Sequence, residues 1–232
     1  MTTPSQSQPP PQSGRALDGV RVAVVDYGLA NIQSVVNALE CFTSNVIVAA
    51  DPADLDGADK IILPGVGHFD AGMKGLRERG HEAALNRIVR EGGTPLIGIC
   101  LGFQFLFSGS EEGSEPGLGW IEGRFERFPR QEGLKVPHMG WSEVSCPRSS
   151  RLFAGLNPPW EFYFVHSYYL PNEGEAANCA SAVCDFGRGF VASIERGNLF
   201  GTQFHPEKSQ LGGMKLIETF LSLPDASCPS TA

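Results

Sequence analysis

Cys100 stands between Gly98 and Gly102, at the end of an apolar run that begins at Pro95. Apolar residues resume after it at helical spacing, so the segment predicts a strand, a sharp turn at the cysteine and then a helix. Small neighbours are needed at such a turn because the backbone passes close to itself. A helix N-terminus also carries partial positive charge, which favours a thiolate. Cys100 is therefore a predicted nucleophile.

A base and a carboxylate follow far downstream, in the segment Gln203-Phe204-His205-Pro206-Glu207. Residues two apart on a strand point to the same face, so strand alternation would place His205 beside Glu207. An imidazole held by a carboxylate is the usual activator of a cysteine or serine nucleophile. Cys100, His205 and Glu207 are the predicted catalytic residues, and hydrolysis of an amide is the predicted chemistry.

A glycine-rich segment, Leu63-Pro64-Gly65-Val66-Gly67, directly follows another predicted strand. It does not complete a dinucleotide-binding fingerprint, because position 70 is Asp where that pattern has Gly. Glycines let backbone N–H groups approach a substrate carbonyl, so the segment predicts an oxyanion loop. The residue after the nucleophile, Leu101, would supply the other N–H donor. Taken alone, the pentapeptide is equally consistent with an ordinary glycine-rich turn.

The elements that must hold these residues alternate through the first half of the chain. Strands are predicted at 20–26, 46–49, 60–63 and 95–99, and helices at 32–39 and between 71 and 90, with a break near Gly80. This alternation predicts a mostly parallel central sheet with helices on both faces, an α/β fold. After Trp120 the chain breaks into short strands at 121–128, 141–144, 162–165, 180–184, 191–194 and 198–204. These predict an antiparallel elaboration, closed by a helix over 213–221.

Composition and charge restrict the partners. A net charge of −8 over 232 residues argues against nucleic acid or an anionic membrane. No apolar run approaches the roughly 20 residues of a membrane span, and no signal peptide is recognised. The six cysteines form no CxxC pair and no zinc-site spacing, so no metal site is predicted. Free thiols indicate a cytoplasmic protein.

The ends of the chain differ in composition from its middle. Residues 1–16 are rich in Ser, Gln and Pro and are predicted to be a disordered tail. Residues 17–223 are predicted to form the one folded domain, and 224–232 a frayed C-terminal tail.

The two catalytic motifs together resemble the class I (triad) glutamine amidotransferases. This resemblance implies a flavodoxin-like class I amidotransferase fold. Within the class, the chain resembles the glutaminase subunits of imidazole glycerol phosphate synthase. That closer resemblance rests on Asp26-Tyr27-Gly28, Pro64-Gly65-Val66-Gly67, Val136-Pro137-His138-Met139-Gly140-Trp141, Tyr163-Phe164-Val165-His166-Ser167-Tyr168 and Gln203-Phe204-His205-Pro206-Glu207-Lys208-Ser209.

The resemblance implies a role for each site residue. Cys100 would attack the side-chain amide of L-glutamine, with Gly65, Val66 and Leu101 as the oxyanion hole. Gly67, Gln104, Ser167 and Tyr168 match positions that bind glutamine. Ammonia would pass to a (β/α)₈ cyclase subunit in a heterodimer, which makes imidazole glycerol phosphate and aminoimidazole carboxamide ribonucleotide in histidine biosynthesis. Neither a cofactor nor a metal is implied.

Other functions stay open at this point. Ser142, Trp120 and His68 depart from the family's usual residues, which leaves room for a paralogous glutaminase that feeds another synthase, for example one that amidates a surface sugar. A cysteine peptidase on a similar fold and a non-catalytic subunit are two further alternatives. His138 and His166 are predicted to be packed structural histidines.

Overall fold

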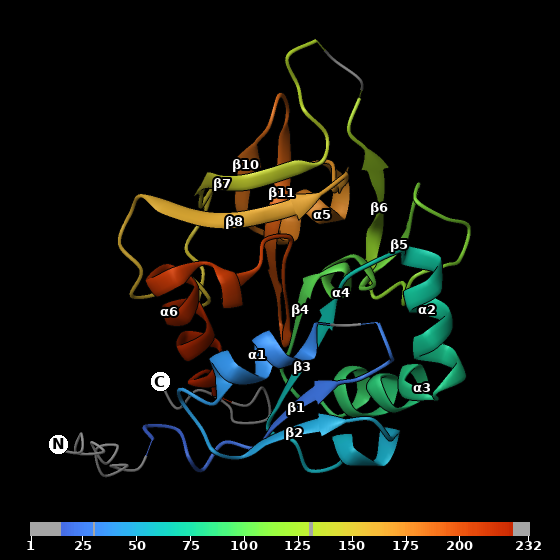
Figure 1. Cartoon of the computed structure of the whole chain (residues 1–232), viewed down its shortest axis with the longest axis vertical. Coiled ribbons are helices and arrows are strands. Elements are labelled where there is room, and N and C mark those ends of the chain that lie inside the picture. The colour runs from blue at the N-terminus through green and yellow to red at the C-terminus, as the bar shows by residue number, and fades with distance from the viewer. Residues whose placement is uncertain (1–14, 30, 130–131, 225–232) are drawn as a thin grey trace, which may run out of the picture.

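The computed structural model describes residues 15–29, 31–129 and 132–224. Within these residues, the core of the molecule is a nine-stranded sheet. Its strand order is β2-β1-β3-β4-β12-β11-β10-β7-β8 (Figure 1). The bounds are β1 Val22–Val25, β2 Val46–Ala49, β3 Lys60–Gly65, β4 Leu96–Cys100, β7 His138–Ser145, β8 Trp160–His166, β10 Ala180–Asp185, β11 Gly189–Arg196 and β12 Leu199–Thr202. A small second sheet has the order β5-β6-β9, with β5 Phe107–Ser110, β6 Ile121–Arg127 and β9 Tyr168–Tyr169.

The first five strands of the large sheet run parallel. β1 pairs with β2 and β3, β3 with β4, and β4 with β12, always in the parallel sense. Strands β1 and β4 are buried along their whole length, which agrees with their continuous apolar sequences. In the parallel ladder Thr202 is the partner of Ile99, so β4 and β12 end side by side. Cys100 is the last residue of β4, and His205 lies in the segment that follows β12.

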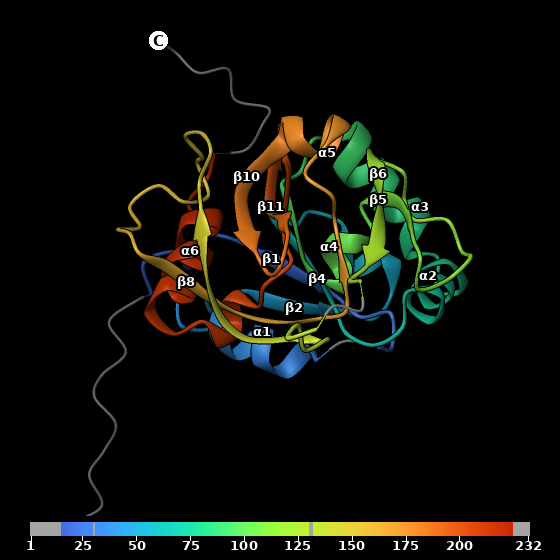
Figure 2. The same cartoon turned by 90° about the horizontal axis from the view of Figure 1, so that it is seen from above.

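Helices cover both faces of the parallel strands (Figure 2). On one face, Phe69 and Leu76 of α2 share a core with Ala23 and Val25 of β1. On the other face lie helices α1 and α6, whose buried side chains pack with Val22 and Val24. The helix bounds are α1 Ile32–Leu39, α2 Phe69–Glu78, α3 His81–Leu85, α4 Leu101–Gln104, α5 Gly174–Cys179 and α6 Gln210–Leu221. Short 3₁₀ turns occur at Pro52–Leu55 and Pro206–Lys208, and a π-helical segment, Asn86–Glu91, continues α3.

The second half of the large sheet is antiparallel throughout. β12 pairs with β11, β11 with β10, β10 with β7 and β7 with β8, each in the antiparallel sense. Along β8 the inward side chains alternate, with Phe162, Phe164 and His166 buried. This half lies above the parallel strands in Figure 1 and forms the upper wall of the site.

The structure confirms the predicted fold class and corrects several elements. The helix expected after Cys100 is only four residues long, because the chain turns back into β5 at Phe107. The predicted helical break is confirmed at Gly80, which adopts a left-handed φ of 78° between α2 and α3. Helix α5 and the small sheet were not predicted. The predicted tails lie outside the described residues, apart from residues 15, 16 and 224.

No helix in the described part of the chain is long and apolar enough to cross a membrane. The same residues contain no cluster of three or more His, Cys, Asp or Glu side chains that could hold a metal ion.

Candidate functional site

Cys100 occupies a strained turn between β4 and α4. Its φ is 54°, a value that non-glycine residues rarely adopt and that costs roughly 1–3 kcal/mol. The turn is close-packed: a Cβ on Gly102 would lie 1.8 Å from the Leu63 carbonyl oxygen, and one on Gly98 would lie 2.7 Å from the Gly102 carbonyl oxygen. Both positions therefore require glycine, as the sequence predicted for an elbow.

His205 and Glu207 are held by a turn rather than by a strand. β12 ends at Thr202, and His205 immediately precedes the helical turn Pro206–Lys208. The prediction that strand alternation aligns the pair was therefore wrong, although the two side chains do meet. The His205 Nδ1 atom lies 2.8 Å from a Glu207 carboxylate oxygen. The His205 N–H donates to the Tyr163 carbonyl at 2.9 Å, which fixes the turn against β8.

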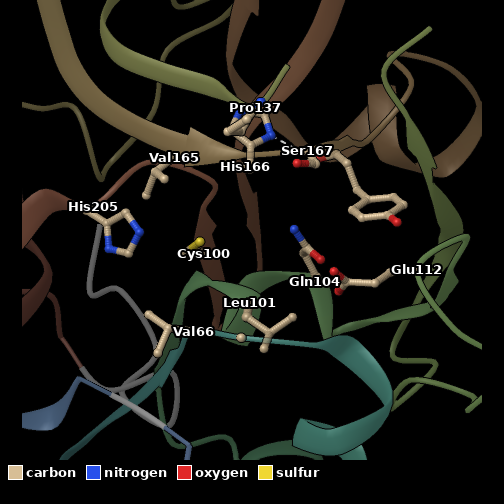
Figure 3. A pocket seen from close by; sticks show the side chains of 12 residues that line it. Val66, Cys100, Leu101, Gln104, Glu112, Pro137, Val165, His166, Ser167 and His205 are labelled. Atoms are coloured by element: carbon tan, nitrogen blue, oxygen red, sulfur yellow. Dashed lines mark hydrogen bonds between the residues drawn. The ribbon is translucent and has the colours of Figure 1, made fainter. Parts of the chain in front are cut away.

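The environment of His205 favours its charged form. Burial of the ring acts to lower the pKa of His205, but the negative charge of a Cys100 thiolate and the hydrogen bond to Glu207 outweigh it and raise that pKa to about 10. The other ring nitrogen, Nε2, is buried and has no hydrogen-bond partner among the described residues. Figure 3 shows the ring and the Cys100 sulfur facing the same cavity. An imidazolium beside a thiolate is the resting state of a cysteine hydrolase.

The cavity at the end of the parallel strands has a volume of about 420 Å³. It is large enough for an amino acid and contains both the predicted nucleophile and the predicted base (Figure 3). Its lining residues are Val66, Gly67, Cys100, Leu101, Gln104, Glu112, Pro137, Val165, His166, Ser167, Tyr168 and His205. Eight of the ten residues predicted for the site are among them, while Gly65 and Glu207 lie behind this first layer.

Gly65 joins the predicted oxyanion loop to the elbow. It is the last residue of β3 and pairs with Cys100 in the parallel ladder. A Cβ on Gly65 would lie 2.5 Å from the Gly102 nitrogen and 2.6 Å from the Tyr27 hydroxyl, so any side chain would separate the loop from the nucleophile. Gly67 has a φ of 99°, which favours glycine, and Val66 and Gly67 face the cavity. The loop is thus beside the nucleophile, where an oxyanion donor is needed.

The residues predicted to bind substrate form the opposite side of the cavity. Ser167 and Tyr168 follow β8 and face the pocket, with Gln104 at the end of α4. The Gln104 side chain is buried, and its Oε1 has no hydrogen-bond partner among the described residues. It is therefore an acceptor available to a ligand.

Glu112 is a cavity residue that the sequence analysis missed. It lies in the connection after β5, and one of its carboxylate oxygens accepts the Phe69 N–H at 2.8 Å, at the start of α2. The carboxylate provides a negative charge in the pocket, opposite the catalytic pair in Figure 3. No local sequence pattern marks it, because its place depends on the path of β5 and the following loop.

Two buried histidines belong to the upper wall, His166 in the lining of the cavity and His138 behind it. His138 Nδ1 and His166 Nε2 are 3.0 Å apart, and the remaining nitrogens contact Ser142 Oγ at 2.8 Å and the Tyr168 carbonyl at 2.7 Å. Burial lowers the pKa of His138 to about 4 and that of His166 to about 3. Both rings are therefore neutral, and the carbonyl of Tyr168 requires the proton of His166 to be on Nδ1. They are packed as predicted, and Ser142 points inward to them, away from the exposed Trp141.

Comparison with known proteins adds independent evidence. A family model described as Glutamine amidotransferase class-I matches residues 23–222. A Moorella thermoacetica protein named imidazole glycerol phosphate synthase subunit HisH is 47% identical over 201 residues, 86% of this chain and 93% of that protein. A Pseudomonas aeruginosa protein named imidazole glycerol phosphate synthase subunit HisH 2 is 45% identical over 202 residues, 87% of this chain and 99% of that protein.

Solved structures share the fold at lower identity. A structure titled glutamine amidotransferase has a TM-score of 0.64 at 21% identity and covers 86% of this chain and 96% of its own. The glutaminase domain of Trypanosoma brucei CTPS with bound acivicin has a TM-score of 0.61 at 21% identity, and the match covers 88% of this chain and 91% of that one. These likenesses concern the fold alone.

Proposed function

The chain belongs to the class-I glutamine amidotransferase family, among the imidazole glycerol phosphate synthase subunits, and from that premise we propose that it hydrolyses L-glutamine with a Cys100–His205–Glu207 triad. The observation that carries the proposal is the shared cavity. It brings together a strained cysteine, a buried imidazole held by a carboxylate, and a glycine loop, although these lie on segments far apart in the chain.

The first half of the reaction is formation of a thioester. The Cys100 thiolate attacks the side-chain carbonyl carbon of glutamine, and the carbonyl electron pair moves to oxygen. The N–H groups of Leu101 and of the Gly65-Val66-Gly67 loop would bind that oxyanion. The His205 imidazolium donates its Nε2 proton to the amide nitrogen, the C–N bond breaks, and ammonia leaves. The products of this half are ammonia, the thioester and a neutral imidazole.

The second half regenerates the enzyme. Neutral His205 removes a proton from water, and the resulting hydroxide adds to the thioester carbonyl. Collapse of the tetrahedral intermediate breaks the C–S bond and releases glutamate, which returns Cys100 to the thiolate beside an imidazolium. Glu207 keeps the ring oriented and stabilises its charge through both halves.

Substrate recognition would use the far side of the cavity. The Glu112 carboxylate and the free Gln104 Oε1 are acceptors that suit the α-ammonium group of glutamine. Ser167 and Tyr168 would bind the α-carboxylate end, with Gly67 alongside. His166, in the upper wall, is neutral and donates a hydrogen bond to the Tyr168 carbonyl.

We infer that the chain is one subunit of a heterodimer whose partner is a (β/α)₈ cyclase that receives the ammonia. The names of the relatives, as synthase subunits, support this, and so do exposed apolar side chains on the outward face of β7, where Met139 is 62% and Trp141 45% exposed. The cyclase would form imidazole glycerol phosphate and aminoimidazole carboxamide ribonucleotide. A cytoplasmic location belongs to the same proposal.

The test is to measure glutamine-dependent and ammonium-dependent synthesis by the co-purified pair. Cys100→Ala is expected to abolish the first and to leave the second intact, because the chemistry is divided between subunits. Cys41→Ala, which removes an exposed cysteine, is the matched control and should retain both activities. Glutaminase activity that survives in Cys100→Ala would overturn the assignment of the nucleophile.

A second candidate is a paralogous glutaminase that supplies ammonia to a different synthase. Relatives from Pseudomonas aeruginosa and Campylobacter jejuni carry the numerals 2 and 1 in their names. The numerals indicate that each organism has more than one such subunit. Family membership argues against the cysteine peptidase considered above. Co-purification with the cyclase and assay of its products separates the two glutaminase candidates.

A further inference from the structure

Gln203 lies directly behind the nucleophile and has no role in the triad mechanism. Its side chain is completely buried, between the end of β12 and the elbow. Its Nε2 donates to the Cys100 sulfur at 3.7 Å, a distance that suits an N–H···S hydrogen bond. Gln203 is thus an uncharged donor fixed on the reacting atom.

A second hydrogen bond determines which end of the Gln203 amide faces the sulfur. Gln104 Nε2 donates to Gln203 Oε1 at 3.2 Å, and both residues are buried. A reversed Gln203 amide would oppose two N–H groups at Gln104 and turn a carbonyl oxygen toward the sulfur. Both contacts would be repulsive for a thiolate, so with the Gln104 amide as it stands the Gln203 amide has one satisfied orientation. Gln104 therefore orients Gln203.

The thiolate needs such a donor because the helix behind it is short. α4 contains only four residues, and a macrodipole requires several aligned peptide groups. The elbow therefore supplies little of the positive potential that the sequence predicted. A buried negative charge without donors is strongly unfavourable, and the imidazolium of His205 lies on only one side of the sulfur.

We propose that Gln203 is a further catalytic residue, which stabilises the Cys100 thiolate by donating a side-chain hydrogen bond to its sulfur, and that Gln104 is the positioning residue for this amide. The proposal rests on Cys100 being the nucleophile of the proposed function. The hydrogen bond is strongest when the sulfur is charged, in the resting enzyme and as the C–S bond breaks. It weakens in the thioester, where the sulfur is neutral.

The experiment is a titration of the Cys100 thiolate by its absorbance near 240 nm, in the full chain. Each variant is measured against the same variant carrying Cys100→Ala, so that the difference reports Cys100 and not the other cysteines. Gln203→Met keeps the length of the side chain and removes the donor. Its thiolate midpoint is expected to move up by about one pH unit, which corresponds to the loss of a hydrogen bond to a charged group. Alkylation of Cys100 by iodoacetamide, followed by peptide mass spectrometry, should slow about tenfold below that midpoint.

Gln104→Met is the second variant. It leaves the Gln203 donor in place but releases its orientation, so a smaller upward shift is expected. Thr43→Val is the matched control, because it removes another buried donor, one that bonds the Val20 carbonyl before β1, at the opposite edge of the parallel strands. Its midpoint should not move.

An unchanged midpoint in folded Gln203→Met, checked by cooperative urea unfolding, would overturn the proposal and leave Gln203 a packing residue. If Gln203→Met does not fold, an unchanged midpoint in Gln104→Met would overturn it. The proposed function fails separately, if Cys100→Ala retains glutaminase activity.

Discussion

The two walls of the cavity are built on histidines that are equally buried, one of them charged and the other neutral. His205 is 2% exposed and His138 is also 2% exposed, yet the pKa of the first is raised to about 10 and that of the second is lowered to about 4. His205 faces a thiolate and a carboxylate. His138 faces another neutral ring, a hydroxyl and aromatic side chains, with Phe164 and Phe186 stacked on its two sides.

The difference shows that burial alone does not decide the state of a histidine. Desolvation lowers the pKa on both walls, and only the wall with two negative partners reverses it. The lower wall, formed by Cys100 and His205 with Glu207 behind them, therefore carries the charges that the chemistry uses. The upper wall is kept neutral, so it can hold Tyr168 without competing for the proton of His205.

The largest effect should come from removing the base. His205→Ala is expected to lower the rate of glutamine hydrolysis by about 10⁶-fold, because both proton transfers lose their carrier. Glu207→Gln keeps the imidazole ring but weakens its orientation. The loss of rate in this variant should be about 10²-fold smaller than in His205→Ala. Ammonia release by the co-purified pair measures both. Equal losses in the two variants would mean that Glu207 does more than orient the ring.

The raised pKa of His205 can be tested by removing the Cys100 thiolate. In Cys100→Ala the thiolate is absent, so the pKa of His205 should fall from about 10 toward its ordinary value, with Glu207 alone holding it up. The chemical shift of the labelled imidazole, followed against pH by NMR, measures the change. A pKa that stays near 10 in this variant would assign the shift to Glu207.

The neutral pair makes stability depend on pH with a definite sign. Unfolded histidines take up protons near pH 6.5, whereas His138 and His166 stay neutral down to about pH 4 and 3. Below pH 6.5 the unfolded chain therefore binds more protons, and stability falls as the pH falls toward 4. Each histidine contributes a slope of up to about 1.4 kcal/mol per pH unit.

His138→Phe should make this slope shallower, as measured by urea unfolding at several pH values. Leu211→Ala, which changes an exposed side chain that does not titrate, is the control and should leave the slope unchanged. An unaltered slope in His138→Phe would contradict the neutral state of the upper wall.

The smallest effect on activity is expected at Ser142, which contacts the outer histidine of the neutral pair, His138. Ser142→Ala removes the hydroxyl that contacts His138 Nε2, at a cost of about 1 kcal/mol, or roughly 2–4 °C in Tm. Glutaminase activity should change by less than about twofold, since the cavity is not touched. A loss of activity as large as that of Glu207→Gln would indicate that the upper wall takes part in proton transfer.

The sequence was sufficient for features encoded within a few residues. The elbow at Cys100 is visible from Gly98 and Gly102, because those glycines satisfy a steric requirement of the turn itself. The parallel strands were predictable from continuous apolar runs, and the meeting of His205 with Glu207 from their spacing. Even there the cause was misassigned, since the turn beginning at Pro206 aligns them.

Features that depend on distant segments could not be predicted. Glu112 enters the cavity only because β5 follows a four-residue helix, and nothing local distinguishes it from a surface glutamate. Gln203 was visible in the motif, but its role depends on Gln104, 99 positions earlier in the chain. The short strand β5 was hidden because Phe107, its one large apolar side chain, continues the spacing of the preceding helix.

Pairing of β4 with β12 makes the separation of nucleophile and base a discrete quantity. Ile99 precedes the nucleophile and is the ladder partner of Thr202, three positions before the base. Backbone hydrogen bonds allow that offset to change only by whole residues, each of about 3.3 Å, and a one-residue step also reverses the side-chain faces. Insertions in the long connection between the two strands leave the offset unchanged. Sequence changes in most of the chain therefore leave the distance between Cys100 and His205 unchanged. A shift in the register of β4 against β12 would change it by a whole residue at once.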